Sequence, residues 1–245
     1  MSSAELWLRI TEVFSRSAVP KVTMIELAVV FAAATALSIP RASWKYFGLL
    51  ATATHELGHA FAAVMSGQRL GGIRLQLDHS GTTTSYSRRR LATVWSGFWG
   101  YPVPALTGAA LLTSGFAGWG PAALSTGTLI LVASLLFIRN FAGVAITVAA
   151  IVSGAALVIF VPSAFTGHVA ICLGVALLVA AVRDLVKLTN VHLRRGDRLA
   201  SSDAYILYRA TSVPSGIWIA LFLAVVAGCW VVAWQPISSI LAAGA

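Results

Sequence analysis

Long apolar stretches dominate this chain and limit the folds that are open to it. About 17–25 apolar residues are needed for a helix to cross the hydrocarbon core of a bilayer. Only 10% of the 245 residues are charged, whereas a soluble domain carries about 25%. We therefore expect an all-α integral membrane protein with about seven transmembrane helices. By length and composition these helices cover residues 22–39, 46–66, 93–113, 120–138, 141–161, 165–186 and 215–234.

The first 21 residues are of a different kind. They hold several charged side chains and lack an apolar core followed by a small-residue cleavage site, so they are not a cleavable signal peptide. Leu6, Ile10 and Val13 fall at helical spacing. This pattern predicts an amphipathic helix on the membrane surface over residues 1–21, followed by one polytopic membrane domain over residues 22–245.

The basic residues indicate an orientation. If the N-terminus is cytoplasmic, alternating loops leave only Arg41 and Lys45 of the 17 Lys and Arg residues outside, and the other 15 lie in the cytoplasm. The positive-inside rule favours this topology. It also explains the net charge of +9 without nucleic acid as a partner. The helices at 46–66 and 165–186 would then run parallel, both towards the cytoplasm.

Residues 72–86 have the pattern of a β-hairpin. Ile73, Leu75 and Leu77 alternate with polar residues, and a Ser-Gly turn leads into a run of threonines. We expect this hairpin at the cytoplasmic surface of the membrane. It could offer a strand edge to an extended peptide, and a purely structural hairpin is equally compatible with the sequence.

The stretch "HELGH" places three ionisable residues in the middle of the apolar segment 46–66. His55 and His59 are four residues apart, so a helix brings both imidazoles to one face, where they can bind one metal ion. Glu56 lies beside them and can act as a general base without being a ligand. A charge in the centre of a span costs about 2.5–3.5 kcal/mol. We interpret the motif as a metal site, the alternative being a polar cluster that fixes helix packing.

A catalytic zinc needs a third protein ligand. We expect Asp184, because it lies at the cytoplasmic end of a helix parallel to the one that carries His59. Asp203 is the second candidate, although it follows two serines and is also typical of a helix start. His168 lies about 24 Å from Asp184 along that helix, towards the other membrane face. Asp78 and His79 fall in the hairpin turn, where we expect them to be solvated.

Two further features lie near the predicted site. Pro102 and Pro104 disfavour a regular helix at the start of the third apolar segment. These prolines predict either a kink or a broken helix that lines a water path. Asn140 stands in the tight turn between two apolar segments, where it forms the turn or donates to an oxyanion.

These motifs together resemble the site-2 protease family of intramembrane zinc metalloproteases, and in detail its bacterial and plant Peptidase M50B-like branch. The matching stretches are "HELGHA" at 55–60, the "GTTT" strand at 81–84, "GYPVPALTG" at 100–108, "RD" at 183–184 and "SDA" at 202–204. The resemblance covers roughly residues 46–234. Better-known members supply the third ligand from an "LDG" or "NPDG" motif, and "RDL" stands in that place here.

The resemblance implies a zinc-dependent endopeptidase that cuts a membrane-spanning protein near the cytoplasmic side. His55, His59 and Asp184 would bind Zn2+, and Glu56 would be the catalytic base. The partners would be a transmembrane protein substrate and the lipid bilayer, in the plasma membrane of a bacterium. Two other functions remain open: a catalytically inactive scaffold that binds membrane proteins, and a metal transporter, which predicts further ionisable residues along the spans.

Overall fold

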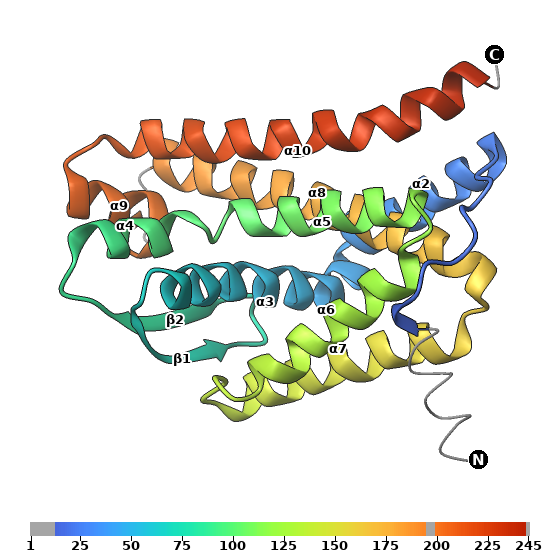
Figure 1. Cartoon of the computed structure of the whole chain (residues 1–245). Helices are drawn as coiled ribbons and strands as arrows, with labels where there is room; N and C mark the ends of the chain where they lie inside the picture. Colours follow the sequence, from blue (N-terminus) through green and yellow to red (C-terminus); the bar gives the residue numbers. More distant parts are fainter. Residues whose placement is uncertain (1–12, 195–198, 244–245) are drawn as a thin grey trace.

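The computed structural model describes residues 13–194 and 199–243, which fold into a bundle of helices with one β-hairpin. The long helices α3, α5, α8 and α10 lie side by side, and the hairpin, α4 and α9 gather at one end of them (Figure 1). The elements in chain order are α2 (Met24–Ser38), α3 (Arg41–Met65), β1 (Arg69–Leu75), β2 (Gly81–Tyr86), α4 (Arg90–Phe98), α5 (Pro102–Phe116), α6 (Gly120–Ser134), α7 (Phe141–Phe160), α8 (Ser163–Leu193), the 3-10 turn η1 (Leu199–Ser201), α9 (Asp203–Thr211) and α10 (Ser215–Ala243).

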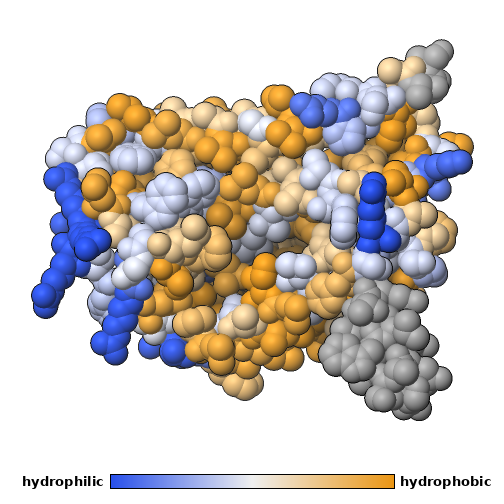
Figure 2. All heavy atoms as spheres, in the orientation of Figure 1, coloured by the Kyte–Doolittle hydropathy of each residue, from blue (hydrophilic) through white to orange (hydrophobic). Residues whose placement is uncertain are grey.

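The surface and the helix lengths are those of an integral membrane protein. Hydrophobic residues cover most of the face shown in Figure 2, and hydrophilic residues gather towards its two ends. Large apolar side chains such as Ile25, Phe141 and Phe160 are exposed. Exposed apolar area on this scale needs a lipid or protein partner.

The predicted number of seven spans is not confirmed. Within the described residues, three helices are long and apolar enough to cross a membrane, namely α7, α8 and α10. The pair α2 and α3 adds a fourth if it is one bent span, because the two helices meet at 87°. Only Ile39 and Pro40 separate them, and proline cannot continue the helix that precedes it. Helix α6 is apolar but short, with 15 residues.

Small residues bring α5 and α8 into close contact. A Cβ atom on Gly108 would lie 2.7 Å from the carbonyl oxygen of Gly174, and one on Gly115 would lie 2.6 Å from that of Gly167. Leu112 and Ile171 are fully buried beside these contacts. Close backbone approach through small residues is the usual way in which membrane helices pack, and it fixes α5 and α8 as the centre of the bundle.

The predicted third span is broken rather than kinked. Helix α4 ends at Phe98 and α5 begins at Pro102, in the position where a missing N–H costs nothing. The connection consists of Trp99, Gly100 and Tyr101. The break follows from the prolines, and it places three residues of irregular backbone against α3.

The predicted β-hairpin is confirmed, and the outer edge of β1 is hydrogen-bonded to another segment of the chain. The strands β1 and β2 pair antiparallel. The amide N–H of Ile73 donates to Phe137 O at 2.8 Å, so the other edge of β1 pairs with the connection between α6 and α7. The side chain of Asn140 bonds both backbone groups of Leu75, at 3.1 Å and 2.7 Å. Asn140 therefore links the connection between α6 and α7 to strand β1.

The predicted N-terminal helix lies mostly outside the described residues, since residues 1–12 are not among them. Residues 16–23 contain no helix. The N–H of Ser17 donates to Gly118 O at 2.8 Å, which places this segment at the end of the bundle opposite to the β-hairpin (Figure 1). Arg16 thus lies far from the hairpin arginines, although the loop count put them on one membrane face.

Candidate metal centre

Three side chains converge between α3 and α9. The Nε2 atoms of His55 and His59 are 3.1 Å apart. Asp203 Oδ2 lies 3.1 Å from each of them. Within the described residues, this is the group of histidine and acidic side chains whose ligand atoms lie close enough together to hold one metal ion.

Helix α3 positions both histidines as the sequence predicts. The small residues around the motif are buried and allow close packing, and they are Ala51, Ala53, Gly58, Ala60, Ala62 and Ala63. A Cβ atom on Gly58 would lie 2.5 Å from Trp99 O, so α3 passes directly under the break between α4 and α5. The Nδ1 atom of His59 donates to Ser96 O at 2.7 Å, because a carbonyl only accepts. Nδ1 therefore carries the proton, and Nε2 has a lone pair that can bind a metal ion, as in many metal-ligating histidines.

Asp203 reaches the histidines because α9 folds back over α4. Ser202 caps α9, its hydroxyl accepting from Tyr205 N–H, which leaves the Asp203 side chain free to point away from its own helix. Leu207 is buried and lies against Gly97 of α4. Arg90 donates to Ala210 O and closes the other end of this contact. Burial opposes the charge on Asp203, but the two histidines beside it hold the pKa of its carboxyl below its usual range.

The three atoms fit a zinc ion. Ligands at about 2.0–2.2 Å from a tetrahedral zinc lie roughly 3.3–3.6 Å apart, close to the observed separations. Gly100, in the break between α4 and α5, leaves space at this point. A Cβ atom there would lie 2.5 Å from His59 Cε1 and 2.7 Å from His55 Nε2. Two imidazoles and a carboxylate are also the donor set of known catalytic zinc sites.

Glu56 is next to this group and is enclosed by β2. The residue is only 5% exposed. The hydroxyl of Thr83 donates to Glu56 Oε2 at 2.6 Å. A Cβ atom on Gly81 would lie 2.5 Å from Glu56 Oε1. The hairpin therefore covers the carboxylate closely, with a hydroxyl at one oxygen and a glycine at the other.

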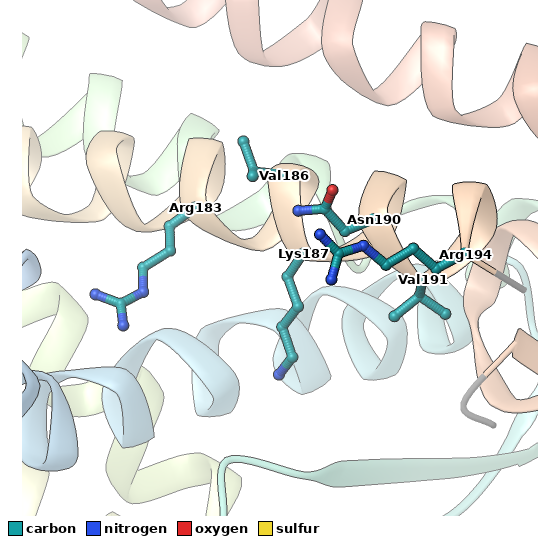
Figure 3. Close-up of a pocket in the computed structure, with 6 residues that line it drawn as sticks. All are labelled: Arg183, Val186, Lys187, Asn190, Val191 and Arg194. Carbon is teal, nitrogen blue, oxygen red and sulfur yellow. The ribbon is translucent and has the colours of Figure 1, made fainter. Parts of the chain in front are cut away.

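Asp184, which we expected to be the third ligand, is not in this group. Its neighbour Arg183 donates to Ser38 O at 2.9 Å and stacks on the Trp44 ring at 4.0 Å, near the start of α3. Asp184 itself still lies close enough to His55 and Tyr101 for electrostatic interaction. It is therefore near the site, but it is not one of the three side chains that converge. Figure 3 shows Arg183 and Lys187 extending from this part of α8, beside a pocket that contains none of the three metal-site residues.

The other residues considered from sequence lie elsewhere. His168 Nε2 is 3.8 Å from Glu26 Oε2 and belongs to the far end of the bundle, as predicted. His79 is only partly exposed, because its Nε2 is 3.2 Å from Trp44 O and its ring stacks on Trp44. Asp78 bonds the N–H and hydroxyl of Ser80 within the turn.

Sequence reasoning missed the parts that Gly100 and Thr83 play. Both stand in stretches that carried the resemblance, "GY…P" and "GTTT", but a glycine or threonine alone gives no chemical signal. For Asp203 a signal was present, since "SSD" predicts a helix start. A carboxylate that follows a capping serine is free to bind something else.

A family model described as Peptidase M50B-like matches residues 27–233. The match begins in α2, ends in α10 and includes every residue of the candidate site. No curated protein and no solved structure matches the chain.

Proposed function

Since the chain belongs to the Peptidase M50B-like family, we propose that it is a zinc-dependent intramembrane endopeptidase with His55, His59 and Asp203 as ligands. The observation that carries the proposal is the triangle of Nε2, Nε2 and Oδ2 atoms, each 3.1 Å from the others, with Glu56 alongside. Zinc was also the metal expected from the sequence, and Asp203 replaces Asp184 as the proposed carboxylate ligand.

A bound zinc supplies Lewis acidity, which acidifies a water and polarises the scissile carbonyl. The protein residues transfer the protons and orient the ligands. Glu56 takes the proton of the attacking water and later gives it to the leaving amine. Its burial limits access of bulk water to the carboxylate. The bond between Ser96 and His59 keeps the imidazole in one tautomer.

The proposed substrate is a membrane-spanning segment of another protein. A helix hides its carbonyl groups in hydrogen bonds, so it must unwind locally before attack. The site lies at the end of the bundle that holds the β-hairpin (Figure 1). Five arginines stand in β1 and around the start of α4, namely Arg69, Arg74, Arg88, Arg89 and Arg90. The positive-inside rule therefore favours cleavage near the cytoplasmic side.

The test is cleavage by the purified protein in detergent, loaded with zinc. Labelled casein serves as an unfolded substrate and a set of single-span membrane proteins as natural-like ones, with new N-termini counted by mass spectrometry. We expect wild type to cut, and Glu56→Gln to bind the same amount of zinc without cutting. Equal processing by both proteins would overturn the role of Glu56. A zinc-loaded wild type that cuts nothing would point to the inactive scaffold, and zinc flux through proteoliposomes would point to the transporter.

A further inference from the structure

We propose that Thr83 on β2 is a positioning residue that orients the Glu56 carboxylate through a hydrogen bond to Oε2. The inference rests on the proposed function, because it concerns the general base of that site. It gives the β-hairpin a part in catalysis that does not depend on any contact with substrate.

One hydroxyl faces two acceptors of the same glutamate. Thr83 Oγ1 is 2.6 Å from Glu56 Oε2 and 3.0 Å from the backbone oxygen of Glu56. A threonine hydroxyl has one proton to donate and lone pairs with which to accept. While Glu56 is ionised, the short bond to Oε2 is the charge-assisted one and takes that proton. Oε2 is thereby fixed, and Oε1 remains as the oxygen that can receive the proton of water.

The same bond remains available once Oε1 has taken the proton of water. Oε2 is then the carbonyl oxygen of the acid, and it still accepts from the Thr83 hydroxyl. The proton passes from water to the carboxylate and from the carboxyl group to the leaving amine. Thr83 neither gains nor loses a proton in this sequence. A carboxylic acid is therefore kept in one orientation during the whole cycle.

The strand is shaped for this contact. Along β2 the less exposed positions are Gly81, Thr83 and Ser85, and they face α3 and the hairpin's own base, while Thr82 and Thr84 are exposed. Gly81 must lack a side chain, since its Cβ would lie 2.6 Å from Glu56 Cγ. Ser85 bonds Gln68 Oε1 at 3.0 Å and so belongs to the base of the hairpin. On this strand Thr83 is the residue whose hydroxyl meets the carboxylate of Glu56.

Three variants separate positioning from a merely structural contact. Thr83→Val keeps the shape but removes the hydroxyl, and Thr83→Ser keeps the hydroxyl. Thr82→Val removes a neighbouring hydroxyl on the exposed face of the same strand. With labelled casein and zinc-loaded protein in detergent, we expect Thr83→Val to lower kcat about 10- to 100-fold, as for loss of a hydrogen bond to a charged group, with KM nearly unchanged. Thr83→Ser should recover most of kcat, and Thr82→Val should stay within about twofold of wild type.

Zinc content and Tm are measured in parallel, and neither depends on catalysis. A Thr83→Val protein that retains its zinc and its Tm but loses kcat supports the proposal. If Thr83→Val cuts like wild type while Glu56→Gln is inactive, the proposed function stands and the role of Thr83 is wrong. If serine fails to restore kcat, or if Thr83→Val loses zinc or Tm, the contact is structural. A wild type that cuts no substrate overturns the proposed function and this inference together.

Discussion

Replacing Gly100 by alanine tests whether the space beside the two histidines is a metal site. Gly100 lies in the irregular connection between α4 and α5. The added Cβ would lie 2.5 Å from His59 Cε1 and 2.7 Å from His55 Nε2. Real Cβ contacts essentially never come so close, and the neighbouring atoms are rigid imidazole rings. The rings must turn away, or the methyl group must occupy the space that the ion needs.

The expected loss can be estimated. Changes that only disturb the orientation of a metal ligand already cost about 10–100-fold in affinity. A methyl group in direct contact with two ligand rings should reach at least the upper value, about 100-fold, which corresponds to roughly 2.7 kcal/mol. The matched control is Gly97→Ala in α4, whose Cβ would meet only the end of the Leu207 side chain, at 3.1 Å.

The assay is competition for zinc with a chromophoric chelator, with Tm measured with and without zinc. Zinc should raise Tm of wild type and of Gly97→Ala, since a ligand of the folded state stabilises it by mass action. At the same zinc concentration it should raise Tm of Gly100→Ala much less. Wild-type zinc affinity in Gly100→Ala would show that the ion, if any, does not sit between His55, His59 and the α4–α5 connection.

Two further predictions concern the hairpin. Gly81→Val should abolish cleavage without loss of zinc, because its Cβ would lie 2.5–2.8 Å from the Glu56 side chain; zinc analysis beside the casein assay checks this, and normal cleavage would contradict it. Asn140→Ala removes both side-chain bonds to Leu75 and should destabilise the contact of α6–α7 with β1 by about 1–3 kcal/mol. Hydrogen exchange at the Leu75 amide should then become faster, and an unchanged rate would show that the two bonds do not hold the strand.

Local features were predictable from sequence where their cause is local. The spacing of His55 and His59 fixes both imidazoles on one face of α3, whatever surrounds the helix. Alternating residues and a turn predicted the β-hairpin, and Pro102 predicted an interruption of the third apolar segment.

Features that depend on tertiary structure were not predictable. Apolar length and composition carry no information on the 87° bend between α2 and α3, and this is one reason why seven spans were expected. Asp184 was preferred because its helix runs parallel to α3, and it does lie near His55. The carboxylate that contacts both histidines is Asp203. This contact depends on α9 packing against α4, and the two segments are more than 100 residues apart in sequence. That Gly100 would face both rings depends on the same packing.

X-ray absorption at the zinc edge tests the central claim most directly. In the purified, zinc-loaded protein we predict two imidazole nitrogens and one carboxylate oxygen at about 2.0–2.2 Å from the ion. This signature should disappear, with most of the bound zinc, in Asp203→Ala, and it should persist in Asp184→Ala. A folded wild type that binds no metal would contradict the account, and so would a zinc site that survives Asp203→Ala but is lost in Asp184→Ala.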